Sequence, residues 1–346
     1  MAYAISEVRP TDKRALAQVD ALLSREGIRR DNSLDYTCIM YDDDWNAIAT
    51  GSCFGNTLRC FAVGAEHQGE GLLNEIVTHL TGVQAARGNF HLFLYTKPDA
   101  AKFFADLGFH EIARVPGTLV FMENRRDGFA GYLRALEKTR RPGKSAAVVM
   151  NANPFTLGHR FLAGTASAAC DTLHLFMVSE DASLVPYAVR KRLIEAGTAD
   201  LQNVVPHDSG AYIVSNATFP SYFLKDEAAV IKGQARLDLQ VFAKIAAALG
   251  VTARYVGEEP HSQVTGLYNQ IMKAELPKAG VECVVLPRKE CGGAAISASA
   301  ARQCIKSGDF DALRELVPPT TYAYFTSAEA APVIERIRRA ADVAHY

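Results

Sequence analysis

A short loop carrying a hydroxyl and an imidazole stands between a strand pattern and a helix pattern near the middle of the chain. The apolar run 146–150 predicts a buried strand, Pro154 ends it, and helical spacing of apolar residues begins after Gly158. A loop that opens at a helix N-terminus offers free backbone N–H groups and the positive end of the helix dipole, which favour a bound phosphate. Thr156 and His159 would stand beside that phosphate. The pattern predicts a phosphate-binding site. The alternative interpretation is a strand-to-helix turn in which the threonine only caps the helix.

A second stretch of this kind is Ile296-Ser-Ala-Ser-Ala-Ala-Arg302, which follows a Gly292-Gly293 loop and begins a helix of alanines. Ser299 can lie at or beside the N-cap, and Arg302 can face the same site because it follows three residues later. A guanidinium and the hydroxyls of Ser297 and Ser299 suit the β- and γ-phosphates of a nucleotide, which must be held as they leave as pyrophosphate. Taken alone, Ser-x-Ser before a helix is more often only a cap.

Both stretches resemble signatures of one enzyme superfamily. Thr156-x-Gly-His159 resembles the (His/Thr)-x-Gly-His signature of the nucleotidyltransferases, which attack the α-phosphate of a nucleoside triphosphate and release pyrophosphate. The stretch 296–302 is similar to their Ile-Ser-x-Ser/Thr-x-x-Arg signature, and Tyr187-x-x-Arg190 to a helix that lines their nucleotide site. A solvated helix arginine is the alternative for Arg190. The resemblance implies His159 and Thr156 as catalytic residues and the following ATP- and phosphate-binding residues: Asn153, Phe155, Gly158, Arg190, Ser297, Ser299 and Arg302.

The first part of the chain carries a different glycine loop. Gln68-Gly-x-Gly71 follows three strand patterns and opens a helix, and Phe103-Phe-x-x-Leu-Gly-Phe109 follows a fourth strand pattern. This order resembles the GNAT acyltransferase fold, whose glycine loop places backbone N–H groups around the pyrophosphate of CoA. The resemblance implies that Gln68, Gly69 and Gly71 bind a CoA-like arm. Leu73 stands where that family has a small residue.

The chain is long enough for two domains, and the charged run 137–144, which ends in Pro-Gly, predicts their boundary. We expect a GNAT-like α+β domain over 1–140 and a Rossmann-like nucleotidyltransferase domain with C-terminal helices over 141–346. Strands alternate with helices in the second domain, which implies a parallel sheet covered on both faces. Pro332–Val343 predicts a solvated amphipathic helix. The predicted strands are 36–41, 47–53, 58–63 and 91–96 in the first domain and 146–150, 172–179, one near 204, 253–257 and 282–286 in the second.

Composition excludes several classes of protein. A formal net charge of -1 provides no long-range field for nucleic acid or an anionic membrane, so we expect neither as a partner. Seven cysteines without a C-x-x-C pair argue against a disulfide framework or a zinc site, and we expect no metal bound by the protein alone. The N-terminus lacks the pattern of a signal peptide, and no apolar run approaches membrane-spanning length. These features predict a cytoplasmic enzyme.

Over its full length the chain resembles a narrower family. The stretches 150–159, 174–181, 217–226 and 256–260 are similar to the citrate (pro-3S)-lyase ligase family, also called citrate lyase synthetase or acetate:citrate lyase ligase, which carries an N-terminal GNAT-like domain. The resemblance implies that ATP and Mg²⁺ activate acetate as acetyl-adenylate, releasing pyrophosphate. The acetyl group then passes to the thiol of the CoA-derived prosthetic group on the citrate lyase acyl carrier protein, releasing AMP. Lys225 is a candidate contact for acetate or a phosphate, with a surface lysine as the alternative.

Two other functions stay open at this point. One is an adenylyltransferase that joins AMP to a phosphopantetheine-like or mononucleotide acceptor at the same phosphate site. The other is a non-catalytic sensor of acyl-CoA or nucleotide, which the altered glycine loop at Leu73 favours and the intact motifs around His159 and Arg302 disfavour.

Overall fold

The computed structural model describes residues 3–31, 33–213, 219, 227–258 and 263–343. The chain forms two compact units, one of Met1–Gly131 with Pro220–Gln240 and the other of Tyr132–Phe219 with Val241–Tyr346. The units divide inside a helix, α4 (Gly128–Glu137), and the first unit includes a segment from later in the chain. The domain boundary after residue 140 therefore stays a prediction.

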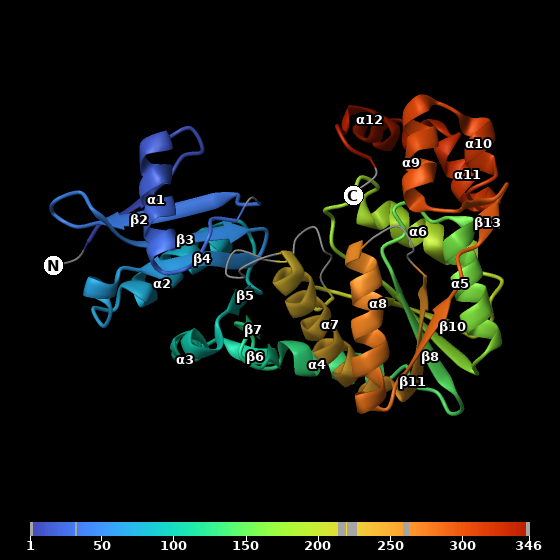
Figure 1. The fold of residues 1–346 in the computed structure, drawn as a ribbon, viewed down its shortest axis with the longest axis horizontal. Coiled ribbons are helices and arrows are strands. Elements are labelled where there is room, and N and C mark those ends of the chain that lie inside the picture. The colour runs from blue at the N-terminus through green and yellow to red at the C-terminus, as the bar shows by residue number, and fades with distance from the viewer. Residues whose placement is uncertain (1–2, 32, 214–218, 220–226, 259–262, 344–346) are drawn as a thin grey trace. The chain divides into compact units, whose positions relative to one another are not determined.

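The first unit is built on a seven-stranded mixed sheet with the strand order β1-β2-β3-β4-β5-β7-β6. Every neighbouring pair is antiparallel except β4 and β5. Figure 1 shows this sheet in blue and teal with α1 and α2 beside it. Its elements are β1 (Ile5–Glu7), α1 (Lys13–Arg25), β2 (Tyr36–Tyr41), β3 (Ala47–Phe54), β4 (Thr57–Val63), η1 (Ala65–His67), α2 (Leu72–Ala86), β5 (Phe93–Thr96), η2 (Pro98–Ala100), α3 (Ala101–Asp106), β6 (His110–Val115) and β7 (Leu119–Glu123).

The one parallel pair of this sheet opens toward its carboxyl end. β4 and β5 are paired only at Thr57 with Phe93 and at Leu58 with Leu94, although β4 continues to Val63. α2 covers the sheet with an apolar face that includes Leu72 and Leu80, as its spacing predicts. Beyond the paired residues, β4 and β5 leave room for a cavity.

The second unit is built on a five-stranded sheet with the order β10-β9-β8-β11-β12, in which all four neighbouring pairs are parallel. The order reverses between β8 and β11, and in such sheets ligands bind at the carboxyl edge beside this switch point. The helices α4 and α7 are divided between the two units. The elements of the second unit are β8 (Ser145–Met150), α5 (Leu157–Ala168), β9 (Thr172–Met177), α6 (Tyr187–Thr198), β10 (Val204–Asp208), α7 (Glu227–Leu249), β11 (Val251–Gly257), α8 (Gln263–Glu275), η3 (Leu276–Ala279), β12 (Glu282–Leu286), β13 (Glu290–Cys291), β14 (Ala294–Ala295), α9 (Ala298–Ser307), α10 (Phe310–Arg314), α11 (Pro319–Phe325), η4 (Ala328–Ala330) and α12 (Ala331–Arg339).

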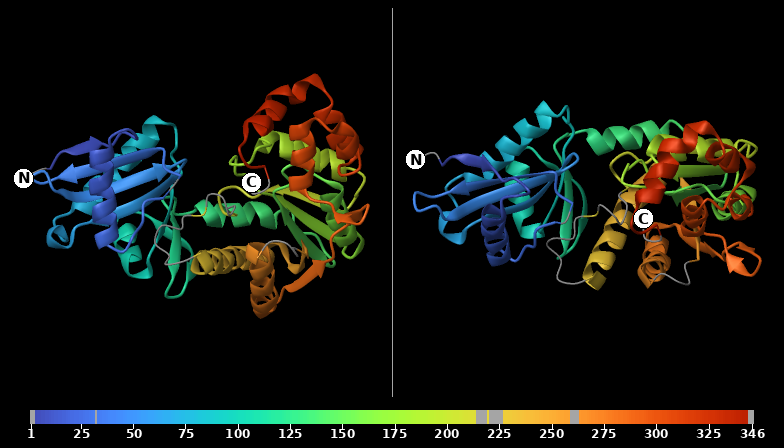
Figure 2. Two further views of the ribbon diagram at one scale, coloured as in Figure 1. Left: turned by 45° about the horizontal axis from the view of Figure 1, so that its top comes forward. Right: turned by 90° about the horizontal axis from the view of Figure 1, so that it is seen from above.

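Helices cover both faces of this parallel sheet, with α5 and α6 on one side and α7 and α8 on the other (Figure 2). Side chains that alternate along β8, such as Ala146 and Val148, belong to a hydrophobic cluster that continues through α5 to α9 and α12. On the other face, the guanidinium of Arg254 in β11 lies 4.3 Å from the ring centre of Phe242 in α7. The predicted fold class, an α+β part followed by a helix-covered parallel sheet, is confirmed by the two sheets.

The end of the chain differs from its prediction. α12 ends at Arg339 rather than continuing to Val343, and its side chains Val333 and Ile337 are buried. Val343 is buried as well, in the cluster that joins α9 to the sheet. The segment is an amphipathic helix as predicted, with its polar face exposed, and its apolar stripe packs against α9.

A pair of buried histidines makes the second unit sensitive to acid. Nδ1 of His174 in β9 lies 2.9 Å from Nε2 of His207 in β10, and burial lowers the pKa of each to about 4. In an unfolded chain these groups titrate near ~6.5. The contribution of the two histidines to the unfolding free energy is therefore complete above that pH. It is lost as the pH falls toward 4, because the unfolded state takes up the protons first.

We expect the double variant His174→Gln, His207→Gln to show a weaker dependence of the unfolding free energy on pH. The loss of unfolding free energy between about pH 7.5 and pH 5, measured by urea denaturation, should be smaller in the double variant by roughly 1–3 kcal/mol. His110→Gln, at an exposed histidine of the first unit, is the matched control for the substitution itself. An equal slope in the double variant and the wild type would contradict the assignment.

Candidate functional site

The loop between β8 and α5 closes on itself through Thr156 and His159. Thr156 is the N-cap of α5: its hydroxyl accepts from the backbone N–H of His159 at 3.4 Å. In return, Nδ1 of His159 accepts from the backbone N–H of Thr156 at 3.1 Å and lies 2.9 Å from the Thr156 hydroxyl. This reciprocal capping box orients the imidazole at the start of the helix.

The same contacts determine which nitrogen of His159 carries its proton. A backbone N–H can only donate, so Nδ1 is the acceptor and the proton of the neutral ring lies on Nε2. Burial, and then the charges of Arg288 and Arg302, lower the pKa of His159 to about 4. At neutral pH His159 is therefore an uncharged ring with one N–H donor available on the side away from Thr156.

Asn153 and Phe155 fasten this loop to the fold. The Asn153 side-chain oxygen accepts from the Val185 N–H at 2.9 Å, and its buried Nδ2 has no hydrogen-bond partner among the described residues. Phe155 is fully buried, and a side chain at Gly197 would collide with its ring. The sequence predicts both as phosphate-binding residues, but in the structure Phe155 is a core anchor.

The second motif begins α9 as predicted, but the N-cap is Ser297, and Ser299 is the second residue of the helix. The Ser297 hydroxyl is the N-cap and accepts from the Ala300 N–H at 3.0 Å. Arg302, which is 2% exposed, donates to the Ser299 hydroxyl at 3.1 Å and to the backbone oxygens of Asn153 and Val343 at 2.5 and 2.6 Å. Burial lowers its pKa to about 10, opposed by the Asp342 carboxylate. Arg302 thus joins the two predicted motifs through the peptide oxygen of Asn153.

Gly158, at the start of α5, also lies in the contact between the two loops. A Cβ at Gly158 would lie 3.2 Å from the backbone oxygen of Ile296, so the absence of a side chain allows the segment before α9 to approach α5. The N-termini of α5 and α9 therefore lie on one side of the parallel sheet, at the carboxyl end of β8. Two helix N-termini and a neutral N–H donor are groups that attract an anion with several phosphate groups.

Arg190 is buried among backbone oxygens rather than solvated. Its side chain is 0% exposed, and it donates to the backbone oxygens of Val185, Asn151, Val178 and Glu180 at 2.5–3.0 Å. The alternative of a solvated arginine is wrong because the side chain is buried, where the oxygens of Asn151 and Val178, which follow β8 and β9, require a donor. We assign Arg190 a positioning role for the loops that follow these two strands.

We expect Arg190→Met to lower the unfolding free energy by about 4 kcal/mol, because several buried carbonyls lose their donor. Urea denaturation followed by circular dichroism measures this. Arg192→Met is the matched control on the same helix: its ion pair with Glu329 is half exposed and should contribute less than about 1 kcal/mol. Equal stabilities of the two variants would contradict the positioning role of Arg190.

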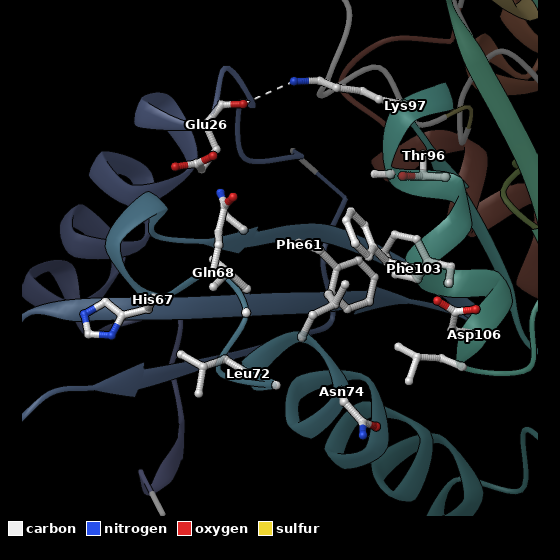
Figure 3. Close-up of a pocket in the computed structure, with 18 of the residues that line it drawn as sticks. Glu26, Phe61, His67, Gln68, Leu72, Asn74, Thr96, Lys97, Phe103 and Asp106 are labelled. Atoms are coloured by element: carbon white, nitrogen blue, oxygen red, sulfur yellow. Dashed lines mark hydrogen bonds between the residues drawn. The ribbon is translucent and has the colours of Figure 1, made fainter. Parts of the chain in front are cut away.

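The first unit holds a separate cavity of about 510 Å³ where β4 and β5 diverge (Figure 3). Gln68 and Leu72 come from the loop and start of α2, while Thr96 and Phe103 come from the opposite wall. Gly69 and Gly71 have φ values of 92° and 81°, in the region that favours glycine, and Gly71 is the N-cap of α2. All three residues that the sequence predicts for a CoA-like arm, Gln68, Gly69 and Gly71, line this cavity.

Some predictions lie outside these two sites. Lys225 falls outside the described residues. Sequence reasoning also missed Arg288, whose charge acts on His159 and which follows β12 without any motif of its own.

Within the described ranges, no three histidine, cysteine or acidic side chains gather as metal ligands, and no helix combines the length and apolarity needed to cross a bilayer.

Comparison with known proteins decides the family. Residues 145–325 match the citrate lyase ligase C-terminal domain. The citrate (pro-3S)-lyase ligase of Escherichia coli K12 is 38% identical over 92% of this chain and 92% of its own length. The chain belongs to the citrate (pro-3S)-lyase ligase family. The ligases of Klebsiella pneumoniae and Haemophilus influenzae are 40% and 36% identical, over 90% and 91% of this chain and 93% and 96% of theirs.

Membership in the ligase family makes this chain an enzyme, and the adenylyltransferase and sensor alternatives are not favoured. Among solved structures, an acyl-CoA N-acyltransferase from Pseudomonas aeruginosa aligns with 36% of the ligase and all of its own chain, at 11% identity and a TM-score of 0.31. A protein described as a nicotinate-nucleotide adenylyltransferase, from Vibrio parahaemolyticus, aligns with 57% of the ligase and 98% of its own chain, at 16% identity and a TM-score of 0.37. Family membership rests on the sequence relatives, since both TM-scores are low.

Proposed function

We propose that this enzyme activates acetate with ATP and acetylates the thiol of the CoA-derived prosthetic group on the citrate lyase acyl carrier protein. A carboxylate oxygen of acetate forms a bond to the α-phosphorus, and the bond from that phosphorus to the pyrophosphate oxygen breaks. The carrier thiol then attacks the acetyl carbon, loses its proton and displaces AMP. The observation that carries the proposal is the neutral His159 ring at the N-terminus of α5, in a chain whose relatives are citrate lyase ligases.

His159 and the two helix N-termini supply the chemistry of the first step. The Nε2–H of His159, which the Nδ1 contact leaves as the donor, would donate to an α-phosphate oxygen, where negative charge grows as the acetate oxygen attacks. Thr156 acts through His159, because its hydroxyl is used within the capping box. Ser297, Ser299 and Arg302 shape the start of α9, beside which the outer phosphates would lie.

Mg²⁺ would neutralise charge on the phosphate oxygens when bound with ATP. The donor set fits a metal that arrives with its nucleotide, since the described residues show no cage of ligands around this site. Lys225 stays a candidate contact for acetate.

We also infer that the cavity of the first unit receives the prosthetic arm, with Gln68, Gly69 and Gly71 at its pyrophosphate. A cytoplasmic location stays a prediction from the sequence.

Isotope exchange between labelled pyrophosphate and ATP tests the first step. We expect exchange that requires acetate, and release of AMP once the thiol form of the carrier protein is added. Propionate in place of acetate would measure selectivity for the acid. Exchange without acetate, or AMP retained in the product, would overturn the proposal in favour of an adenylyltransferase.

A further inference from the structure

Residues 340–343, which follow α12, form a strap that is bound at both ends to α9. Nζ of Lys306 donates to the backbone oxygen of Ala340 at 2.6 Å, and Nε of Arg302 donates to the backbone oxygen of Val343 at 2.6 Å. Lys306 follows Arg302 by four residues in α9, so both cations extend from one face of this helix. α9 and α12 lie side by side (Figure 1) and pack on each other. The strap therefore runs from the end of α12 to the second motif.

The two anchors of the strap differ in kind. Val343 is 6% exposed and belongs to the same hydrophobic cluster as Ala301 and Ile305 of α9. The other anchor is the oxygen of Ala340, which is the C-cap of α12, and a cation at this end of a helix also interacts favourably with the helix dipole. One end of the strap is thus held by burial and a hydrogen bond, and the other by the Lys306 ammonium.

Arg302 connects this strap to the loop of His159. Its Nη1 donates to the backbone oxygen of Asn153 at 2.5 Å, and its Nη2 donates to the Ser299 hydroxyl at 3.1 Å. Because a guanidinium is planar, the directions of its Nε–H and Nη1–H bonds are fixed relative to each other. The oxygens of Val343 and Asn153 therefore cannot move independently while both hydrogen bonds are kept.

Asn153 begins the short segment that leads to the capping box. Three residues later Thr156 caps α5, and its backbone N–H and hydroxyl orient the His159 ring. The side chain of Asn153 is held separately, by the Val185 N–H. A shift of the Asn153 peptide oxygen would thus pass along three residues to the imidazole.

We propose that the strap 340–343 positions the adenylation site by acting through Arg302 on the loop of Asn153 and His159. The inference rests on the proposed function and extends it to a segment that no motif marks. Release of the strap would let the guanidinium turn away from Asn153, and the Nε2–H of His159 would then lie away from the α-phosphate oxygen on which charge develops. Such a misplacement raises the barrier more than it weakens the binding of ATP, whose phosphates are also attracted by the helix N-termini.

Release of the strap at Lys306 tests the proposal in the full-length enzyme. Lys306→Met removes the hydrogen bond to Ala340, and we expect the kcat of acetate-dependent exchange to fall at least roughly fivefold while the KM for ATP changes by less than about twofold. Lys306→Arg keeps a charged donor and should restore most of kcat. Arg336→Met, at an exposed cation of α12, is the matched control and should behave as the wild type.

A second variant releases the other end. Val343→Ala removes buried packing at that anchor and should lower kcat in the same way, with folding checked by circular dichroism. If both substitutions act by freeing one strap, the double variant Lys306→Met, Val343→Ala should lose no more kcat than the more affected single variant. Losses that multiply in the double variant would contradict a shared path through the strap.

NMR of the His159 ring gives a readout that does not depend on acetate activation. In the ligand-free enzyme its resonances should shift in Lys306→Met and stay at the wild-type positions in Arg336→Met. Wild-type kcat with unchanged His159 resonances in folded Lys306→Met would overturn the inference. If the wild type lacks acetate-dependent exchange while Lys306→Met still shifts these resonances, the proposed function fails and the link from the strap to the loop holds.

Discussion

His159→Ala is expected to reduce acetate-dependent pyrophosphate exchange by roughly 10²–10³-fold while the enzyme stays folded. The ring donates its Nε2–H where charge appears only during the reaction, so its removal raises the barrier more than it weakens the binding of ATP. Because its pKa is about 4, the wild-type rate should show no ionisation of His159 between about pH 5.5 and 8. Steady-state exchange with separate KM and kcat values measures both effects.

Two further variants make this result specific to His159. His159→Gln keeps an N–H donor of similar reach and should retain more activity than His159→Ala. His110→Ala, at an exposed histidine of the first unit, should behave as the wild type. Exchange near the wild-type rate in folded His159→Ala would remove the imidazole from the mechanism.

Gly71→Val is expected to separate the two half-reactions. A Cβ added there meets no atom within 4 Å beyond its chain neighbours, so a valine would project toward the open space of the first unit's cavity, with added strain because φ is 81°. Acetylation of the carrier protein should fall at least roughly tenfold, whereas acetate-dependent pyrophosphate exchange should change by less than about twofold. The reason is that His159 and the other described residues assigned to adenylation lie in the second unit.

Gly117→Val is the matched control for strain, because Gly117 has a φ of 66°, open space around its Cβ position and a turn outside the cavity. Gln68→Glu gives the same test without strain, by placing a negative charge where the arm's pyrophosphate is expected. If both cavity variants acetylate the carrier at the wild-type rate, the first unit does not receive the arm. If both lose exchange as well, the adenylation site requires that cavity.

The local sequence by itself determined where several strands and helices of this protein begin and end. The predicted strands Tyr36–Tyr41 and Glu282–Leu286 have the observed bounds, because the neighbouring turns and the β-branched or aromatic residues act within a few positions of the chain. Each of the two motifs starts a helix, because a capping hydroxyl satisfies N–H groups only two or three residues away, although the cap of the second helix is Ser297 rather than Ser299. The glycine loop at Gly71 starts a helix for the same local reason.

Tertiary structure decided what each charged side chain does. Arg190 and Arg302 look alike in sequence to a phosphate-binding arginine, yet both are buried against carbonyls that come from distant segments, such as Asn153 and Val343. Arg288 has no motif, and only the pairing of β11 with β12 brings it to the edge beside α5. Whether a guanidinium meets a ligand or a backbone oxygen depends on burial, which is a property of packing between segments that sequence spacing does not contain.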